Sequence, residues 1–181
     1  VIVPTIRHFL EDERHRLDLM VDNTENLLGK LERGELDFAV IEGVFDKEQY
    51  QCRLYKKENF VGICAKQHPF AGKTVPLEQV LRESLVVREK GSGTRRLLEQ
   101  AVESRGFSLD SFKNCSSSSN FFVICELVAL NNAITFAYEP ISRCRDDLAV
   151  FNVEDMSITG EFNLVYINEQ AAGPKIEVFF K

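Results

Sequence analysis

Three short polar stretches carry the residue types that bind anions and small polar ligands. They are Asn23-Thr24-Glu25-Asn26-Leu27, Gly91-Ser92-Gly93-Thr94 and the serine run Ser116–Ser119. Each lies where a predicted strand gives way to a helix, so hydroxyl groups stand beside the free N–H groups of a helix N-terminus. Such N–H groups bind carboxylates and phosphates. The pattern favours a ligand-binding cleft, because ligands of open α/β sheets lie beyond the carboxyl ends of the strands.

Each stretch also has a purely structural interpretation. Asn23 suits an N-cap, Gly91 and Gly93 suit an ordinary capped turn, and four consecutive serines are common in solvent-exposed loops. The glycine-bearing stretch matches neither the P-loop nor the G-x-G-x-x-G pattern, which argues against nucleotide binding. An ordinary capping role therefore stays open as the alternative to ligand contact at all three stretches.

The residues that could support catalysis are few. The three histidines, His8, His15 and His68, lie in charged or turn segments, and neither a G-x-S-x-G nor an H-E-x-x-H motif occurs. Cys64 and His68 could pair on spacing alone, but nothing nearby favours an activated thiolate. The acidic run Glu11-Asp12-Glu13 suits a solvated face better than a metal site. We expect no catalytic residue, no cofactor and no metal.

The composition is that of a soluble globular protein. The chain has 181 residues, 44% of them apolar and 28% charged, and no run approaches the roughly 18 apolar residues of a membrane span. Its net charge of −6 argues against direct binding of duplex DNA by this chain. Five scattered cysteines without a C-x-x-C pair favour reduced thiols in the cytoplasm, with redox sensing as the sharper alternative.

The elements that position the polar stretches alternate between helix and strand, which predicts an α/β fold with mainly parallel strands. Apolar spacing and turn residues predict helices over 4–13, 24–33, 77–81, 95–105 and 121–130. Strands are predicted over 17–21, 36–41, 53–57, 59–65, 84–87, 112–115, 133–137, 148–153 and 162–167, and a final element begins at 175. Gly34 and Gly106 mark helix ends.

Several motifs follow one another in a recognisable order. The most specific is Leu31-Glu32-Arg33-Gly34-Glu35-Leu36-Asp37-Phe38-Ala39-Val40, which has the form L-x-x-G-x-L-D-x-A-[IV]. The others are Pro4 with Phe9, Asn23–Leu27, His68-Pro69-Phe70-Ala71, Val75-Pro76-Leu77, Gly91–Arg95 with Leu98-Glu99, and Val128–Glu139. In this order and spacing, the chain resembles the effector-binding domain of LysR-type transcriptional regulators over essentially its whole length.

The resemblance implies the type 2 periplasmic-binding-protein fold, in which two crossing strands join two α/β lobes. On the family pattern, 1–65 and 168–181 form lobe I and 66–167 form lobe II, with crossings near Ala65-Lys66 and Ile167-Asn168. A small-molecule effector, such as a small carboxylate or another polar anion, would bind between the lobes and control DNA binding allosterically. Carried over by position, the effector-binding residues are Asn23, Thr24, Glu42, Gly43, Ser92, Gly93, Thr94, Ser117, Ser118, Ser119 and Tyr138.

The same resemblance implies partners. A homodimer or higher homo-oligomer would form through the helix Pro4–Glu13 and the strand Arg16–Val21 in an isologous contact. The family's first strand and its winged helix-turn-helix domain would precede Val1, so DNA would be contacted only through that further domain. Asn131 and Ala133 stand where the family has two glycines, and we expect the turn at Ala133 to differ slightly.

Two other classes of protein share this fold. One is an extracytoplasmic solute-binding protein, against which the free cysteines argue, and the other is an enzyme, against which the sparse catalytic residues argue. An upstream helix-turn-helix would mark a regulator, and an upstream signal peptide would mark a transport protein. The sequence thus predicts a cytoplasmic, non-enzymatic sensor domain that makes no membrane contact.

Overall fold

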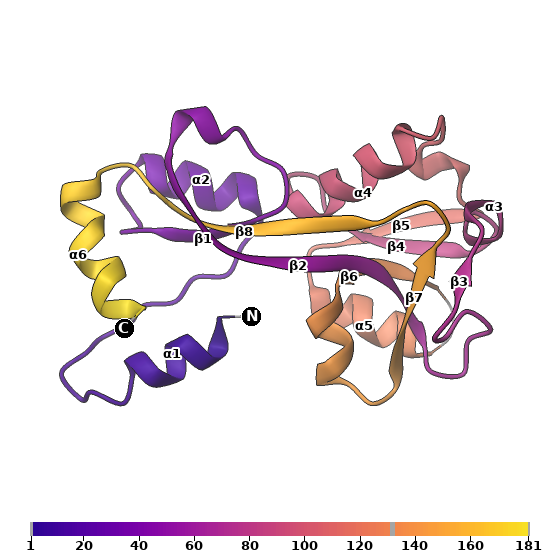
Figure 1. Cartoon of the computed structure of the whole chain (residues 1–181), viewed down its shortest axis with the longest axis horizontal. Coiled ribbons are helices and arrows are strands. Elements are labelled where there is room, and N and C mark those ends of the chain that lie inside the picture. The colour runs from indigo at the N-terminus through magenta and orange to yellow at the C-terminus, as the bar shows by residue number, and fades with distance from the viewer. Residues whose placement is uncertain (1, 131–132, 181) are drawn as a thin grey trace.

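The chain forms two lobes joined by a pair of long strands (Figure 1). The computed structural model describes residues 2–130 and 133–180, so Asn131, which begins the turn expected to differ at Ala133, lies outside the described residues. The first lobe holds α1 (Val3–Phe9), α2 (Thr24–Glu32), β1 (Ala39–Glu42), η1 (Lys47–Gln49) and α6 (Glu169–Phe179). The second holds β3 (Thr74–Val75), α3 (Leu77–Val80), β4 (Ser84–Arg88), α4 (Gly93–Glu103), η2 (Leu109–Ser111), β5 (Asn114–Ser118), α5 (Phe121–Ala129), β6 (Thr135–Tyr138), η3 (Glu139–Cys144) and β7 (Leu148–Val153).

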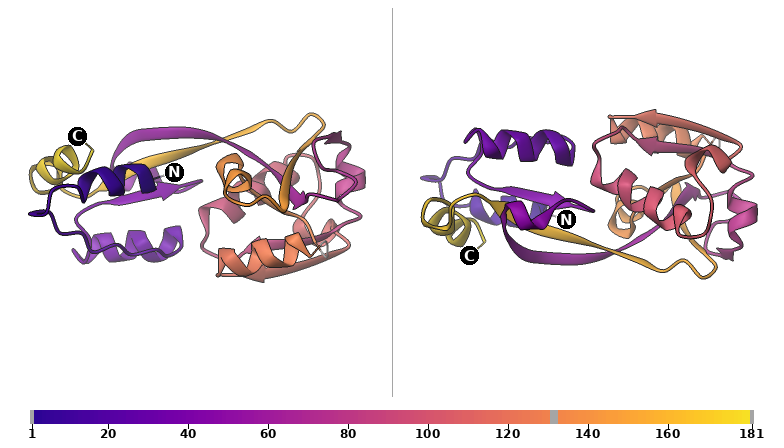
Figure 2. Two further views of the ribbon diagram at one scale, coloured as in Figure 1. Left: turned by 90° about the horizontal axis from the view of Figure 1, so that it is seen from below. Right: turned by 90° about the horizontal axis from the view of Figure 1, so that it is seen from above.

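The two connecting strands, β2 (Gln51–Ala65) and β8 (Ile158–Tyr166), pack in both lobes. In β2, Cys52 packs against the core of the first lobe, whereas Phe60 and Cys64 belong to the main core of the second. In β8, Val165 lies in the first lobe and Phe162 in the second. Both views in Figure 2 show these strands as the bridge between the lobes.

The expectation of mainly parallel strands is wrong for the larger sheet. Its order is β1-β8-β2-β7-β3, and β6 also pairs with β2. Four of its pairings within the described residues are antiparallel, and β3–β7 is parallel. The cause is the bridge itself: β2 and β8 cross in opposite directions, and β1, β6 and β7 each pair antiparallel with one of them. The smaller sheet, β4–β5, is parallel as expected.

Residues 53–65 form part of one strand of 15 residues, where the sequence predicted two. The predicted break lay at Glu58, but there the strand crosses between the lobes and Glu58 stays paired with Gly160 of β8. The ladder with β8 continues through this point and changes register between Leu54 and Lys56.

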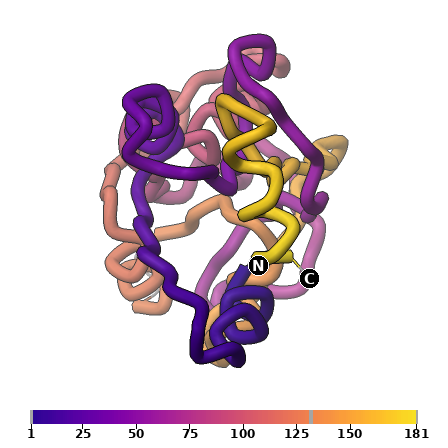
Figure 3. The backbone as a smooth tube through the Cα atoms, turned by 90° about the vertical axis from the view of Figure 1, so that its left-hand side faces the viewer, coloured from indigo at the N-terminus to yellow at the C-terminus, as the bar shows by residue number. Residues whose placement is uncertain are grey.

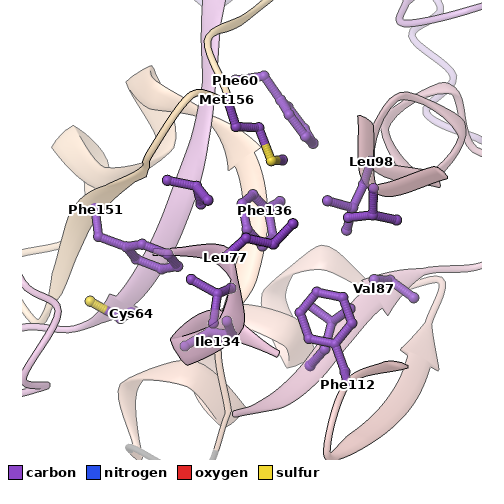
Figure 4. Close-up of a cluster of buried hydrophobic side chains, with 14 of the residues drawn as sticks. Phe60, Cys64, Leu77, Val87, Leu98, Phe112, Ile134, Phe136, Phe151 and Met156 are labelled. Carbon is purple, nitrogen blue, oxygen red and sulfur yellow. The ribbon is translucent and has the colours of Figure 1, made fainter. Parts of the chain in front are cut away.

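The main core lies in the second lobe, between the larger sheet and the helices α3 and α4. Its centre is aromatic: Phe151 is fully buried, and its ring lies 5.7 Å from that of Phe136 (Figure 4). The Phe70 ring lies 5.4 Å from Phe151. Gly62 of β2 lies directly against the Phe151 ring. A Cβ at this position would stand 2.2 Å from the ring, so only glycine leaves room for it. The first lobe has smaller clusters around Leu31, Ile41, Val165 and Ile176, among others.

The strand predicted over Leu17–Val21, and with it the strand Arg16–Val21 of the expected dimer contact, does not form. The segment between α1 and α2 runs along one side of the first lobe (Figure 3) without pairing, and Leu19 and Val21 are 62% and 87% exposed. Alternating apolar residues form a strand only beside a partner, and the edge of β1 lies across a cavity from this segment.

Helix positions agree better with the sequence, because their signals are local. Asn23 caps α2, and Gly34 and Gly106 have positive φ just beyond the ends of α2 and α4. Two helices differ from the prediction. α1 ends at Phe9 instead of Glu13, and α6 begins at Glu169, six residues before the predicted element, because Asn168 caps it.

Candidate effector site between the lobes

The first of the three polar stretches caps α2. Asn23 Oδ1 accepts a hydrogen bond from Asn26 N at 2.9 Å, so the structural interpretation of this residue is correct. The next residue, Thr24, is buried and turns toward the second lobe. Its hydroxyl donates to the carbonyl oxygen of Glu42 at 3.4 Å and accepts from the backbone N–H of Gly93 at 3.3 Å.

The second stretch begins α4 and faces the first lobe. Ser92 is the N-cap residue, but its hydroxyl lies 3.0 Å from that of Thr94 instead of capping the helix. Thr94 in turn donates to Glu42 Oε1 at 2.8 Å. Ser92 and Thr94 are both buried. The N-terminus of α4 is therefore bonded to the end of β1 through side chains of both lobes.

The backbones of the two lobes also touch at this point. A Cβ on Gly93 would lie 2.2 Å from the Glu42 carbonyl oxygen, and a Cβ on Gly43 would lie 2.5 Å from the Gly93 carbonyl carbon. Gly43 additionally has φ +77°, which disfavours any other residue. We call the contact made by Thr24, Glu42, Gly43, Gly93 and Thr94 the interlobe latch.

The electrostatics of the latch centre on Glu42. Burial raises the pKa of the Glu42 carboxyl above its usual range, while the Thr94 hydrogen bond and the positive charge of Arg88 act in the opposite direction. Close by, the hydroxyl of Tyr138 is buried and has no hydrogen-bond partner within the described residues. Burial, and to a smaller extent the charge of Glu42, raises the pKa of Tyr138, while the nearby backbone N–H of Gly43 acts in the opposite direction.

The serine run behaves differently from the expectation that it caps α5. Ser116 to Ser118 belong to β5, and the cap is Asn120, whose Oδ1 accepts from Phe122 N at 2.9 Å. Ser118 instead bonds to the backbone of Asn120. Ser117, Ser118 and Ser119 do not line the cavity described next, although Ser118 is the strand partner of Arg88, which does.

A cavity of about 1300 Å³ extends from the latch along the first lobe. At its interlobe end it is lined by Asn23, Thr24, Glu42, Arg88, Ser92 and Tyr138, with Ile141 and Phe162 beside them. It then continues between the segment 14–23 and the edge of β1. Five of the predicted site residues therefore line one cavity. Gly43, Gly93 and Thr94 do not line it but belong to the adjacent latch. A second cavity of about 380 Å³ lies across α2, and Thr24 reaches both.

Sequence reasoning missed Arg88. It ends β4 beside the glycine turn, and its guanidinium is paired through two hydrogen bonds, at 2.9 and 3.1 Å, with the carboxylate of Glu89. A basic residue at the carboxyl end of a strand, followed by a glycine-bearing helix start, is a signal that could have identified it.

The remaining reactive residue types have structural roles. His15 stacks on Phe9, and His68 Nδ1 accepts from Phe70 N at 3.1 Å. Burial raises the pKa of Cys64 to about 12, which leaves that thiol protonated at neutral pH. Across residues 2–130 and 133–180, no group of His, Cys, Asp and Glu has the arrangement needed to hold a metal ion. None of the described helices is both long and apolar enough to cross a membrane.

Comparison with known proteins gives the family. The model of the "LysR substrate binding domain" matches residues 1–181. The chain belongs to this family. This confirms the resemblance expected from the ordered motifs.

Curated relatives of this LysR substrate-binding domain are transcriptional regulators. The regulator CysL of Bacillus subtilis is 31% identical over 103 residues, which cover 56% of this chain and 34% of CysL. The chain spans about a third of the length of the first curated relatives it matches.

Solved structures show the same fold at low sequence identity. The QuiR effector-binding domain in complex with shikimate has a TM-score of 0.79 at 16% identity, covering 99% of this chain and 88% of that one. The regulatory domain of CcmR from Synechocystis, in complex with 2-PG, has a TM-score of 0.78 at 17% identity, covering 98% and 89%. The mixed α/β fold is thus the type 2 periplasmic-binding-protein-like fold, as expected.

Proposed function

We propose that this LysR substrate-binding domain binds a small-molecule effector at the interlobe end of the large cavity and passes the binding event to a DNA-binding domain of its parent protein. The observation that supports this most directly is that one cavity is lined by Thr24 and Glu42 from the first lobe and by Arg88, Ser92 and Tyr138 from the second. A ligand in contact with both sides stabilises one relative orientation of the lobes by its difference in affinity for the two orientations.

We propose two lobes as expected, but with the crossings inside β2 and β8 and not at Ala65-Lys66 and Ile167-Asn168, because Phe60 and Cys64 already pack in the second lobe and Val165 packs in the first. The protein acts as a cytoplasmic sensor without enzymatic activity or cofactor in this proposal. The functions of the other protein classes that share this fold, transport and catalysis, gain no specific support from the residues at the cavity.

The cavity is larger than a site for one small ligand, which typically occupies about 300–1,000 Å³. We propose that its outer part receives a further strand, since β1 is an edge strand and the segment 14–23 lies opposite it. A longer polypeptide that supplies this strand should protect the amides of residues 39–42 from hydrogen exchange. Unchanged exchange there would contradict the idea.

We also propose an isologous homodimer. α1 with its C-cap residue Leu10 and the segment 16–21 expose Val3, Leu10, Leu19 and Val21, and α5 with its C-cap residue exposes Phe122 and Leu130. Both regions lie on the side of the molecule seen from below in Figure 2. A two-fold axis between two copies would place the first region of each copy on the α5 region of the other, and DNA would be contacted only by the parent protein's separate domain.

The effector class expected from the hydroxyl-rich stretches was a small carboxylate or another polar anion. Arg88 is the basic residue at the interlobe end, and an anionic effector would have to compete with Glu89 for it. A thermal-shift screen of metabolites against the full-length protein, including shikimate and 2-PG, tests both the site and the class.

The matched variants are Thr24→Val, in the latch, and Thr159→Val, an exposed threonine of β8. Thr24→Val should reduce the ligand-induced rise in melting temperature severalfold, and Thr159→Val should leave it unchanged. If no metabolite stabilises the protein, or if Thr24→Val keeps the full shift across a saturating titration, the assignment of this site is wrong.

A further inference from the structure

The pairing of the two bridge strands is irregular at one point. Leu54 of β2 lies opposite Asn163 of β8, and Lys56 lies opposite the adjacent residue Phe162, so Tyr55 is an extra residue in β2. Such a β-bulge bends its strand and increases the local twist. It lies between the part of β2 that packs in the first lobe and the part that packs in the second. The bridge is therefore bent where one lobe gives way to the other.

The same row of the sheet contains a residue of the interlobe latch. Phe162 of β8 lies opposite the bulge on one side and pairs with Glu42 of β1 on the other. The Glu42 carboxyl is in turn bonded to Thr94 of the second lobe. A displacement of β1 that opens the latch is therefore applied to β8 directly beside the bulge.

The extra residue, Tyr55, contacts both lobes. Its side chain packs against the main core of the second lobe and also against the first-lobe cluster that contains Leu164 and Ile176. Its ring lies 5.1 Å from the Phe180 ring at the end of α6, and its hydroxyl lies 3.2 Å from that of Thr5 in α1. Packed interiors are nearly incompressible and transmit displacements. Bending at the bulge must therefore move Tyr55 relative to one lobe or the other.

The element that such a movement affects most is α1. This helix has seven residues, none of them buried, and helices of this length are marginal without tertiary contacts. Phe9 holds it on α6 through a ring-to-ring contact of 5.1 Å with Phe179, and the hydroxyl pair of Thr5 and Tyr55 holds it on the bridge. Loss of the hydroxyl pair weakens the attachment of α1 to the bridge while its contact with α6 remains.

We propose that the bulge is the pivot of the bridge, and that Tyr55 is a positioning residue that passes the orientation of the lobes to α1. While the latch is closed, Tyr55 holds Thr5 and with it α1. When the latch opens, Tyr55 follows the second lobe and α1 loosens. The coupling rests on the proposed function, because α1 and its C-cap carry Val3 and Leu10 of the proposed dimer contact, and it gives the route by which an effector would change that contact.

Opening the latch by substitution tests the coupling without a ligand. Gly93→Ala should force β1 and α4 apart, because its Cβ would lie 2.2 Å from the Glu42 carbonyl oxygen. Backbone hydrogen exchange of residues 3–10 is followed by mass spectrometry on the full-length protein, and exchange in β7 of the main core measures any loss of global stability in the same samples. Beyond the change in β7, Gly93→Ala should accelerate exchange in residues 3–10 about fivefold, the factor expected for the loss of one hydrogen bond.

A milder variant covers the case in which Gly93→Ala does not fold. Thr94→Val removes only the hydrogen bond to Glu42, and it then replaces Gly93→Ala in every comparison. Because it opens the latch less, the expected acceleration is about threefold.

Substitutions of the hydroxyl pair assign the coupling to Tyr55. Tyr55→Phe keeps the ring and removes the bond to Thr5, so by itself it should accelerate exchange in residues 3–10 about fivefold. In this background, opening the latch should add less than about twofold, because the bond is already lost. Thr5→Val should behave in the same way. Tyr50→Phe is the matched control: the Tyr50 hydroxyl donates to Glu32 in the same lobe, and its loss should leave the full effect of opening the latch.

The outcomes separate the pivot from the proposed function. Unchanged exchange in residues 3–10 when the latch is opened would overturn the coupling, and so would an effect of opening that persists in full in Tyr55→Phe, since a merely structural hydroxyl adds the same increment in every background. Neither result affects the effector site, which is tested by the metabolite screen with Thr24→Val. If no metabolite stabilises the protein while the coupling is observed, the pivot stands and the proposed effector function fails.

Discussion

Two glycine-to-alanine substitutions should have opposite effects on stability, although both residues lie in helices. Gly29 lies inside α2, and a Cβ there would meet only the far end of the Arg33 side chain, at 3.3 Å. Gly93 is the first residue of α4, and a Cβ there would lie 2.2 Å from the Glu42 carbonyl oxygen and 2.9 Å from Thr24 Oγ1.

The magnitudes follow from these contacts. Alanine is favoured over glycine in a helix interior by about 0.8–1 kcal/mol, so Gly29→Ala should stabilise the protein by up to that amount. Non-bonded heavy atoms pack at roughly 3.5 Å, so Gly93→Ala must move β1 and α4 apart by roughly 1 Å. That movement breaks the hydrogen bonds of Thr24 and Thr94, which contribute about 0.5–1.5 kcal/mol each, and should destabilise the protein by about 1–2 kcal/mol after the gain in helix propensity.

Urea denaturation followed by circular dichroism measures both variants. Their free energies of unfolding should differ by about 2 kcal/mol, or roughly 4–8 °C in melting temperature. Thr94→Val should be strongly non-additive with Gly93→Ala, because both lose the same contact. If Gly93→Ala is as stable as Gly29→Ala, the lobes do not touch at this point and the latch is wrong.

Other contacts give sharper or simpler tests. The pKa of Glu42 in the folded protein is raised above its usual value of 4.5. The ionised carboxylate therefore lowers the free energy of unfolding at pH values above the raised pKa, and this loss of stability disappears as the pH falls toward 4.5. Glu42→Gln should thus be the more stable form at pH 8 and lose that advantage by pH 4.5 in urea titrations, and a pH-independent difference would refute this. Phe151→Ala should cost about 3–5 kcal/mol in the same assay, because the fully buried ring fills the space over Gly62. Asn120→Ala should lower the free energy of unfolding by about 0.5–2 kcal/mol and Ser119→Ala should leave it almost unchanged, because Asn120 caps α5. Equal losses of stability in the two variants would mean that Asn120 is not the capping residue. Phe122→Asp, at a side chain that is 67% exposed, should weaken self-association at least tenfold in sedimentation experiments while leaving monomer stability nearly unchanged, and an unaltered dimer would remove α5 from the interface.

Local signals in the sequence predicted the elements that they encode. Asn23 before a row of leucines, Gly34 and Gly106 after helical spacing, and the apolar runs of β4 and β7 need no distant partner to be interpreted, and α2, α4, β4 and β7 lie where they were expected. The fold class followed from the order of motifs, since no single one of them is specific.

Features that depend on distant partners were not predictable in the same way. The segment Leu17–Val21 has the alternation of a strand and forms none, because pairing is decided by a neighbour and not by the segment itself. The serine run was expected at a helix cap, but one residue further on Asn120 competes for the same N–H groups. Glu42 was predicted as a ligand contact, and its bond to Thr94 joins residues 52 positions apart, which no spacing rule reveals.

The long bridge has a consequence for how the molecule comes apart. Because β2 contributes Cys52 to one core and Phe60 to the other within a single hydrogen-bonded ladder, and β8 does the same in return, neither lobe possesses a complete set of strands of its own. Unfolding one lobe strips strands from the other, so we expect a single cooperative transition and no separately foldable halves. A denaturant would therefore unfold the chain as one cooperative unit, although a ligand in the cavity contacts two distinct lobes.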